Sequence, residues 1–381
     1  MNVLNVIMSL DPVHGGGTVE RTVQMSLYLI RHGVSCTVLT TDIGLTRKRV
    51  NDLAGINIVR LKTLNKRYYL PILSPAKIRN YVRSTDIIHL MNHWTFLNAV
   101  IYLFAWALKK PYVMCPAGTL SIFGRSKKLK KIYNLLIGKR IIRNAWGLIA
   151  ISTEEINQFC SFGVERKKIV LIPNGIDPAS YQYADGNAFK EKYGIGKSAI
   201  ILFVGRLNSI KGPDLLLKAF HKVIHYNYPQ YCLVFAGPDG GMLSELRNYV
   251  TENHIGDRVH FVGYLGERDK ASAFCAADFL VIPSRQEAMS IVVLEAGIAG
   301  TPVLLTDQCG FDIVDEIKGG KVVPASVAGL QLGLTELLGR PENLKAMGKR
   351  LYDYILKNYA WDKVILKYIE MYDQILKSRA K

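Results

Sequence analysis

The feature that most constrains this chain is a regular alternation of short apolar runs with longer amphipathic runs, repeated from one end to the other. The apolar runs are rich in β-branched residues and have the length of buried strands, and the amphipathic runs have the period of helices. Such alternation predicts parallel sheets whose strands are joined by right-handed helical crossovers. The expected strands are residues 3–10, 36–41, 56–61, 87–90, 112–115, 148–151 and 169–172, then 200–204, 232–235, 259–262, 279–282, 303–305 and 321–323; the expected helices include 19–31, 129–144, 214–225 and 242–253.

A chain of 381 residues is too long for one hydrophobic core, so two domains are expected. The turn-forming sequence IPNGID favours a boundary at 173–175, which gives domains 1–175 and 176–360 and a strongly helical tail, 361–381. The first residues, MNVLNVIMSLDP, lack the basic start of a signal peptide and are expected to form a strand. Six cysteines are scattered singly beside apolar runs, which favours buried, reduced thiols in the cytoplasm.

Positive charge is concentrated in the first half of the chain. Residues 1–175 contain 25 Lys and Arg against 8 Asp and Glu, a net charge of +17, whereas the remainder contains 24 against 23, a net charge of +1. No acidic residue lies between Asp86 and Glu154. This asymmetry indicates an anionic partner for the first domain only.

The most basic segment runs from Arg125 to Arg143 and has apolar residues at helical spacing. Three interpretations are open: the solvated face of an ordinary packed helix, docking to an anionic membrane surface, and nucleic-acid binding. Each Lys or Arg near an anionic membrane contributes about 1 kcal/mol, so several hold a protein there without a lipid anchor. Because no nucleic-acid motif accompanies the charge, we predict peripheral attachment to the cytoplasmic face of a membrane and no nucleic-acid partner. The apolar positions are Leu129, Ile132, Tyr133, Leu136, Ile137 and Ile141.

Two cations and two carboxylates in the second half lie where predicted strands end. Arg206 and Lys211 lie in FVGRLNSIKGPDLLLKAF, just after one strand, and Glu287 and Glu295 lie in VIPSRQEAMSIVVLEAGIAG, where another strand gives way to a helix. Ligands of open α/β sheets bind at the carboxyl ends of the strands. These four residues therefore suit a ligand that carries both phosphate and hydroxyl groups.

Ser290 is the expected N-cap of a helix that begins near Ile291. Glu287 would lie in the loop before this helix, and Glu295 about one turn inside it. The helix N-terminus offers N–H groups and a partial positive charge to an anion, and a carboxylate can accept two hydrogen bonds from a diol such as ribose. The alternative is a pair of solvated surface glutamates.

Three glycines, Gly15, Gly16 and Gly17, follow the first predicted strand and precede a helix expected from Val19, with Thr18 as its N-cap. Consecutive glycines let a backbone approach a ligand closely, and a glycine loop that opens a helix is typical of a phosphate site. A flexible turn is the alternative. The loop has neither the Gly-Lys-Ser/Thr of a Walker motif nor a clean GxGxxG, so nicotinamide binding is not favoured.

These motifs resemble those of the large retaining glycosyltransferase family with the GT-B fold, called group 1 or family four. GRLNSIKGPDLL resembles the family's Gly-Arg-Leu…Lys-Gly motif, PSRQEAMSIVVLEAGIAGTPVLLTD its Glu-x7-Glu signature, and IPNGID its hinge. The resemblance implies two Rossmann-like, doubly wound parallel-sheet domains facing across a cleft. It implies that the first domain binds the acceptor and the second the nucleotide-sugar donor, and that the C-terminal helix crosses back onto the first domain.

The resemblance also assigns roles to single residues. It implies that Arg206 and Lys211 contact the donor diphosphate, with Gly16 and Gly17 opposite. It implies that Glu295 holds the ribose hydroxyls and Glu287 the donor sugar, so that Glu287, Arg206 and Lys211 are the expected catalytic residues. The other expected donor contacts are the main chain at Met289, Ser290 and Ile291 and, near the base, Val262, Gly263 and Tyr264.

The chain departs from the family pattern in two places. Ala117, in CPAGTL, stands where many relatives carry His or Arg, and Ala288-Met289-Ser290 replaces the usual Pro-Phe-Gly. His14 and His93 are the candidates for the acceptor side. Because no Asp-x-Asp motif occurs, we expect no metal and no other cofactor.

The sequence thus predicts a retaining, metal-independent hexosyltransferase that moves a sugar from a nucleoside diphosphate to a glycan or lipid-linked acceptor. The expected setting is the biosynthesis of a surface polysaccharide such as lipopolysaccharide. Two alternatives are a nucleotide-sugar epimerase of the same fold, which would need no acceptor, and a non-catalytic subunit that binds the sugar nucleotide without turnover.

Overall fold

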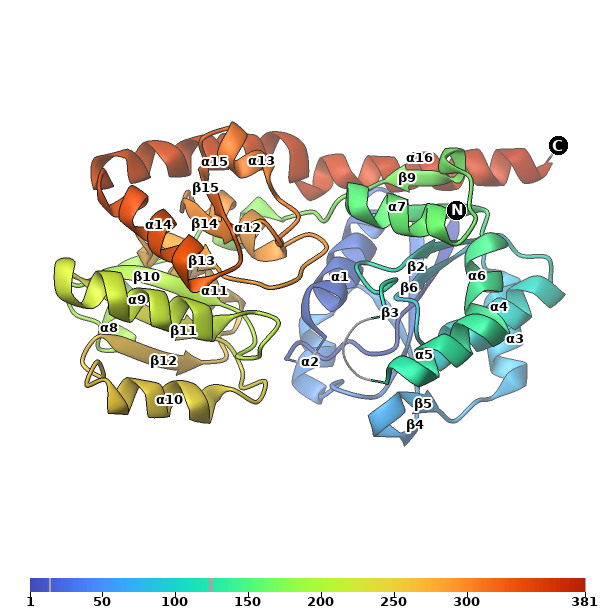
Figure 1. Ribbon diagram of the computed structural model, residues 1–381. Helices are drawn as coiled ribbons and strands as arrows, with labels where there is room; N and C mark the ends of the chain where they lie inside the picture. Colours follow the sequence, from blue (N-terminus) through green and yellow to red (C-terminus); the bar gives the residue numbers. More distant parts are fainter. Residues whose placement is uncertain (14, 123–125, 381) are drawn as a thin grey trace. The chain divides into compact units, whose positions relative to one another are not determined.

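The computed structural model describes residues 1–13, 15–122 and 126–380 and divides into two compact units. Unit 1 comprises Met1–Gly175 and Trp361–Lys381, and unit 2 comprises Ile176–Ala360. Each unit is built on one parallel sheet with helices packed on both of its faces (Figure 1). The predicted α/β class with two Rossmann-like sheets is confirmed.

The sheet of unit 1 has the strand order β3-β2-β1-β6-β7-β8-β9. The chain leaves β1 toward one edge and returns to pair β6 with the other side of β1, so the direction of winding changes between these two strands. Its strands are β1 (Asn2–Val6), β2 (Ser35–Thr41), β3 (Asn57–Leu61), β6 (Ile87–Met91), β7 (Tyr112–Cys115), β8 (Gly147–Ala150) and β9 (Ile169–Leu171).

A short antiparallel hairpin, β4 (Thr63–Asn65) with β5 (Leu70–Pro71), was not expected from the sequence. The helix expected over 129–144 is interrupted by a π-helical turn, Asn134–Gly138, in which Gly138 leaves space for the Asn134 side chain. The helices are α1 (Gly16–Arg31), α2 (Arg47–Asp52), α3 (Pro75–Ser84), α4 (Phe96–Ala107), α5 (Lys127–Tyr133), α6 (Lys139–Arg143), α7 (Thr153–Ser161) and α16 (Trp361–Ala380), with 3₁₀ turns at Lys66–Tyr68 and Arg166–Lys168.

The C-terminal helix α16 belongs to unit 1 and packs against α1. The buried guanidinium of Arg21, on α1, donates hydrogen bonds to Asn174 Oδ1 (2.6 Å), to the carbonyl of Ile172 (2.9 Å) and to the Tyr368 hydroxyl of α16. A Cβ on Gly175 would lie 2.6 Å from the indole of Trp361, so the end of the first segment packs closely on the start of α16. The tail is therefore an integral part of the core of unit 1.

The sheet of unit 2 has the order β12-β11-β10-β13-β14-β15, and its winding changes direction between β10 and β13. Its strands are β10 (Ala199–Val204), β11 (Tyr231–Ala236), β12 (Val259–Gly263), β13 (Phe279–Ile282), β14 (Val303–Thr306) and β15 (Gly320–Val323). Its helices are α8 (Gly186–Lys192), α9 (Pro213–Asn227), α10 (Leu243–Glu252), α11 (Glu267–Ala276), α12 (Ile291–Ile298), α13 (Ile313–Glu316), α14 (Val327–Leu338) and α15 (Leu344–Tyr359), with 3₁₀ turns at Pro178–Tyr181 and Pro341–Asn343.

Candidate active site

The loops that follow β10 and β13 bring together the cations and carboxylates singled out in the sequence. Arg206 and Lys211 lie in the loop between β10 and α9, and Glu287 lies in the loop between β13 and α12. Strands β10 and β13 are neighbours at the point where the winding of the sheet reverses. This is the position at which ligands bind in doubly wound sheets.

Two donors hold the carboxylate of Glu287. Lys211 Nζ lies 2.6 Å from Glu287 Oε1, and Ser284 Oγ donates a hydrogen bond of 2.5 Å to the same oxygen. Ser284 is completely buried, and its carbonyl accepts a hydrogen bond from Thr306 Oγ1 on β14. The carboxylate therefore has a defined orientation at the end of the sheet.

The loops after β10 and β13 are also joined to each other. Arg285 donates its backbone N–H to the carbonyl of Ile210 (2.7 Å), and its guanidinium makes two hydrogen bonds to the Asp214 carboxylate. Burial raises the pKa of Asp214, but the hydrogen bonds and charge of Arg285 outweigh that effect and hold the pKa below its usual range. A Cβ at Gly212, where φ is +66°, would lie 2.1 Å from the carbonyl oxygen of Pro283, so glycine is required at this contact.

The loop after β14 supports the segment that carries Glu287. The N–H of Glu287 donates to the carbonyl of Gln308 (2.8 Å), and the N–H of Ser290 donates to that of Cys309 (3.3 Å). Cys309 is buried, and burial raises the pKa of its thiol to about 12, so it is neutral and serves in packing.

Ser290 is the N-cap of α12, which begins at Ile291 as the sequence predicts. The Ser290 side chain makes no capping hydrogen bond within the described residues, and its buried hydroxyl has no partner there. The N–H groups of the first turn of α12 are thus not capped by Ser290 and are available to an anion. Met289, just before the cap, is buried, and Ile291 is half-buried.

Glu295 lies one turn into α12, where only 7% of its side chain is exposed, and Lys270 Nζ of α11 lies 2.5 Å from its Oε1. Arg206 is exposed at the same edge of the sheet and forms no ion pair in the part of the chain that the structure describes. The segment expected near the base follows: Val262 and Gly263 end β12, and the ring of Tyr264 is about half exposed.

The glycine loop of unit 1 has a different helix start from the one expected. Helix α1 begins at Gly16, which has φ of +58°, and Gly15 is its N-cap. The prediction that Thr18 caps the helix is wrong, because Thr18 already lies inside it and its carbonyl accepts a hydrogen bond from Thr22 Oγ1. Gly16 and Gly17 form the first turn of α1, the helix that follows β1, and β1 lies where the winding of the sheet reverses. The first N–H groups of a helix have no acceptor within the helix.

The structure describes only one of the two histidines that were expected to contact the acceptor. His14 lies outside the described residues. His93 is completely buried among aromatic rings that include Trp94 and Tyr133, and its Nε2 lies 2.8 Å from Asn134 Oδ1. Burial lowers the pKa of His93 to about 4. A neutral ring without solvent access cannot contact an acceptor, so His93 is a packing residue.

Ala117 adopts a left-handed backbone, with φ of +51°. The next N–H, of Gly118, donates to the Glu155 carboxylate (2.7 Å), which also accepts from the N–H of Ile151 (2.9 Å). The loop is thereby held by a buried acidic side chain of α7. This arrangement could not be predicted from the sequence, because Glu155 resembles an ordinary acidic residue in the first turn of a helix.

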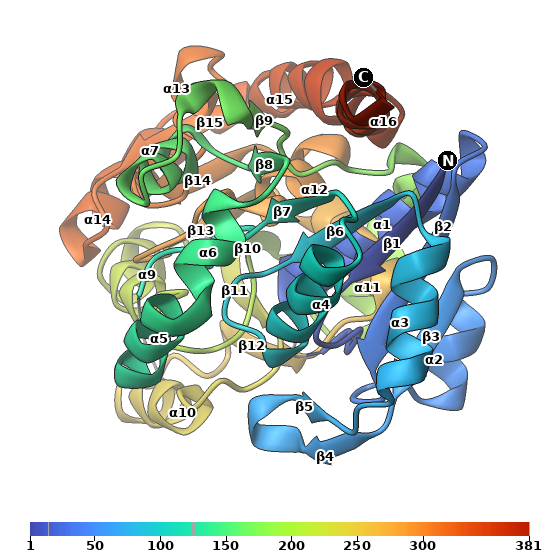
Figure 2. The same ribbon diagram turned by 90° about the vertical axis from the view of Figure 1, so that its right-hand side faces the viewer.

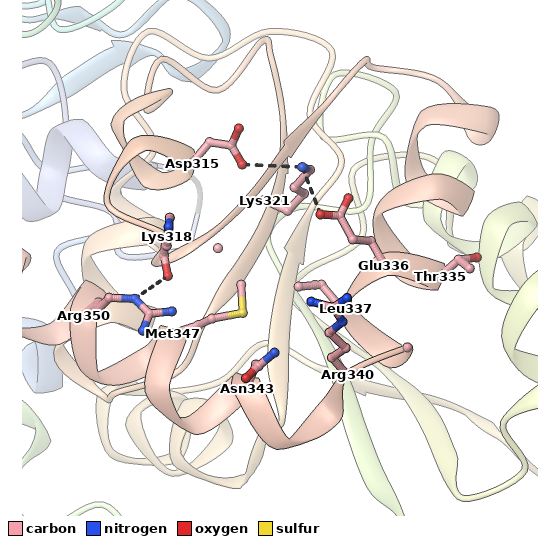
Figure 3. A pocket seen from close by; sticks show the side chains of 12 residues that line it. Asp315, Lys318, Lys321, Thr335, Glu336, Leu337, Arg340, Asn343, Met347 and Arg350 are labelled. Carbon is pink, nitrogen blue, oxygen red and sulfur yellow. Dashed lines mark hydrogen bonds and ion pairs between the residues drawn. The ribbon is translucent and has the colours of Figure 1, made fainter.

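A separate hollow of about 840 Å³ lies away from the carboxyl ends of the strands. It is beside the amino end of β15 and between α13, α14 and α15 (Figure 3). Within it, Lys321 forms ion pairs with Glu336 (3.1 Å) and Asp315 (3.8 Å), and Arg350 Nε donates to the carbonyl of Lys318 (2.9 Å). Among the residues that the structure describes, none of those expected to contact the nucleotide-sugar donor lines this hollow.

Among the described residues, no group of three or more His, Cys, Asp and Glu side chains is arranged to hold a metal ion. The helices described here include none with the length and apolar character needed to cross a bilayer. Four of the six cysteines are buried as expected, but Cys160 and Cys275 are exposed, and all six are free thiols.

Two residues of the site were not identified from the sequence. Ser284 has a recognisable signal, since a serine two residues after a buried strand and three residues before a glutamate can reach its carboxylate. Lys270 has no comparable signal, because it lies 25 residues from Glu295 and only the packing of α11 beside α12 brings them together.

Two family models match the chain. The model for glycosyl transferases group 1 matches residues 185–353, and the model for glycosyltransferase family 4 matches residues 15–180. A D-inositol 3-phosphate glycosyltransferase of Nocardia farcinica is 29% identical over 62% of this chain and 54% of its own length. An uncharacterized glycosyltransferase of Methanocaldococcus jannaschii is 24% identical over 98% of both chains. The chain spans about half the length of the inositol-phosphate relatives that it matches.

Solved structures share the fold. HepE of Anabaena, determined in complex with UDP, superposes with a TM-score of 0.81 at 18% identity, over 98% of this chain and all of that one. WaaG, a glycosyltransferase involved in lipopolysaccharide biosynthesis, superposes with a TM-score of 0.71 at 20% identity, over 98% of this chain and 99% of that one. The fold is therefore that of the GT-B glycosyltransferases. With both family models matched, the chain belongs to the group 1 glycosyltransferases.

Proposed function

We propose that this protein is a retaining, metal-independent glycosyltransferase that moves a hexose from a nucleoside-diphosphate sugar to a glycan or lipid-linked acceptor. One observation carries the proposal: Arg206, Lys211, Glu287 and the N-terminus of α12 meet at the carboxyl ends of β10 and β13. Family membership supports the retaining outcome, and complexes of HepE with UDP and UDP-glucose support a nucleotide-sugar donor.

Cleavage of a sugar–diphosphate bond builds negative charge on the leaving diphosphate and positive character at the anomeric carbon. Positive groups that are already in place stabilise that transition state most effectively where water is excluded. Arg206 offers a planar fork of donors and Lys211 a compact charge, and the first-turn N–H groups of α12 add a partial positive charge. These groups supply the positive charge that the leaving group needs without a metal.

Glu287 is placed to contact the donor sugar while it remains held. The Lys211 ammonium has three N–H donors, so it can keep its contact with Glu287 Oε1 and still reach a phosphate oxygen. The second carboxylate oxygen of Glu287 is then available to a sugar hydroxyl. Glu295, one turn inside α12, is assigned to the ribose hydroxyls.

A cationic and apolar surface of unit 1 supports attachment to an anionic membrane. Tyr133, Ile137 and Ile141 pack inward, but the other expected apolar positions of the basic segment point to solvent, and Leu135 joins them with 79% of its surface exposed. The segment lies beside α4 (Figure 2): Tyr133 donates to the carbonyl of Thr95, the N-cap of α4 (3.1 Å), and Asn144 donates to the Tyr102 hydroxyl within α4 (2.9 Å). The exposed apolar residues are Leu129, Ile132, Leu135 and Leu136, with Leu103 and Trp106 of α4.

Exposed lysines and arginines alternate along the basic segment with four of these apolar side chains. Complete burial of a leucine side chain contributes about 1.5–3 kcal/mol, so partial burial at a bilayer interface contributes a fraction of that, and each nearby cation adds about 1 kcal/mol at an anionic surface. Arg125, the first residue of the predicted segment, lies outside the described residues. We therefore propose a peripheral enzyme of the cytoplasmic membrane face that acts in surface polysaccharide assembly. The exposed cations are Lys127, Lys128, Lys131, Lys139, Arg140 and Arg143.

The deciding experiment incubates the purified chain with UDP-, GDP- and ADP-linked hexoses, with and without a lipid-linked saccharide extract. Release of nucleoside diphosphate together with a product one hexose heavier, unaffected by EDTA and with the donor's anomeric configuration, is the expected result. Conversion of the sugar nucleotide without acceptor would instead identify an epimerase. Binding without any turnover across the panel would identify a non-catalytic subunit.

A further inference from the structure

Helices α11 and α12 of unit 2 are joined by an ion pair whose carboxylate is the residue assigned to the ribose. Lys270 Nζ contacts Glu295 Oε1, and the two side chains are 26% and 7% exposed. Lys270 lies outside the Arg/Lys and Glu-x7-Glu motifs of this chain. Its role therefore has to be argued from its position in the fold.

The position of Lys270 links two parts of the candidate site. Helix α11 begins three residues after Tyr264, in the segment assigned to the base, and the N–H of Lys270 donates to the carbonyl of Gly266 (2.8 Å) within its first turn. Lys270 and Phe274 are four residues apart and share one helix face. The Phe274 carbonyl accepts a buried hydrogen bond from Thr301 Oγ1 (2.7 Å), which anchors that face beside the end of α12.

A carboxylate as deeply buried as that of Glu295 loses most of its hydration, and a lysine partner offsets that cost. Removing only the lysine would leave an uncompensated buried charge, which tends to rotate toward water. A carboxylate has about four lone-pair positions. Lys270 occupies one of them on Oε1, so Glu295 can still accept two hydrogen bonds from the vicinal hydroxyls of a ribose.

We propose that Lys270 is a positioning residue for ribose recognition: it holds the Glu295 carboxylate in the orientation that accepts the 2′- and 3′-hydroxyls of a nucleoside diphosphate. The inference rests on the proposed function, because that function supplies the nucleoside diphosphate. Lys270 acts only through Glu295, whereas Arg206 and Lys211 bind the phosphates. Its loss should therefore affect discrimination of the ribose hydroxyls more than binding of the diphosphate.

The test measures dissociation constants by calorimetry for whichever of UDP, GDP and ADP binds most tightly, and for its 2′-deoxy and 3′-deoxy counterparts. Hydrogen bonds to a charged acceptor are worth about tenfold or more in affinity, so the wild type should prefer the ribonucleotide by roughly tenfold. In Lys270→Met this preference should shrink to within about threefold. Lys270→Arg should restore it, and Lys270→Met combined with Glu295→Gln should lower it no further.

Lys192→Met is the matched control, because Lys192 is also ion-paired to α11, through Asp269 (2.6 Å), but at an exposed position. It should retain the wild-type preference. A tenfold preference that persists in Lys270→Met, or is absent from the wild type, overturns the inference while nucleotide binding itself still stands. If none of the three nucleoside diphosphates binds the wild type, the proposed function fails as well.

Discussion

Lys211 and Glu287 form an ion pair at the junction of two loops, with Nζ and Oε1 2.6 Å apart although the residues are separated by 76 positions in the chain. The cation comes from the loop after β10 and the carboxylate from the loop after β13. Before a donor binds, the two charges neutralise each other. A bound sugar diphosphate would present phosphate oxygens to the lysine and hydroxyls to the glutamate. This one pair of residues would therefore contact both groups that the breaking bond joins, the diphosphate and the sugar.

Replacing Lys211 by Met, or Arg206 by Ala, should lower kcat by at least about 100-fold. The reason is that each removes a positive group that stabilises the leaving diphosphate mainly in the transition state. Steady-state kinetics with the donor identified in the panel would measure this loss. Lys222→Met, on the exposed face of α9, is the matched control and should retain wild-type turnover. Near-normal kcat in both site variants would remove the two cations from the mechanism.

Replacing Ser284 by Ala should lower kcat by about tenfold, because Glu287 Oε1 would lose a hydrogen bond made to a charged acceptor. Ser326→Ala is a suitable control, since Ser326 caps α14 in the same unit and its loss should cost stability of about 1 kcal/mol without affecting turnover. Kinetics and thermal unfolding of both variants separate the two effects. A Ser284→Ala enzyme with unchanged kcat would show that Lys211 alone orients Glu287.

The fold could be predicted from the sequence wherever one local pattern decided the structure. Strands β7 and β13 have the predicted bounds. Each is a run of four buried apolar residues, which is too short for a helix and is bounded by turn-forming residues. The start of α12 at Ile291 was predictable for the same reason, since a serine cap precedes an apolar run. The start of α1 was not, because three adjacent glycines carry no capping side chain and allow several entry points.

What could not be predicted depends on contacts between distant segments. Helical spacing identified the apolar positions of the basic segment, but it did not distinguish Ile137, which packs inward, from Leu136, which is exposed. A histidine at the end of a strand is equally consistent with a binding loop and with the core. The burial of His93 is decided by Tyr133 and Asn134, about 40 residues away in the chain.

Unit 1 should lose stability as the pH falls below 6.5. Burial lowers the pKa of His93 to about 4 and that of His89 to about 3, so between pH 6.5 and those values the unfolded chain binds protons that the folded chain does not. The expected loss is on the order of 2 kcal/mol per histidine between pH 6.5 and pH 5. Urea unfolding followed by tryptophan fluorescence reports this unit, because all four tryptophans belong to it.

The buried carboxyl of Glu155 acts in the opposite direction, since burial raises its pKa and its protonation favours the fold at low pH. Comparison of the wild type with His93→Gln removes that common contribution. The variant should show a smaller decrease in stability between pH 7 and pH 5. An equal decrease in the two proteins would show that His93 does not contribute to the acid sensitivity.

Replacing Leu135 and Leu136 together by Glu should weaken sedimentation with phosphatidylglycerol-containing vesicles by more than about tenfold. Both side chains lose their apolar contribution at the bilayer interface and gain repulsion from its anionic surface. Nucleotide binding should be unchanged, because neither Leu135 nor Leu136 is among the residues expected to contact the donor. Leu332→Glu, at an exposed leucine on α14 of unit 2, is the control and should sediment like the wild type.

Salt separates the apolar from the electrostatic part of this attachment. At 0.5 M NaCl the field of the exposed cations is screened within a few ångströms, whereas the transfer of leucine into the interface is not weakened. The wild type should therefore retain part of its vesicle binding at high salt. A variant in which Lys127, Lys128, Lys130 and Lys131 are all changed to Gln should bind at low salt more weakly than the wild type, but more strongly than the wild type at high salt, because Lys139, Arg140 and Arg143 keep their charge. Sedimentation of the Leu135 and Leu136 double variant at the wild-type level would show that these side chains do not enter the lipid.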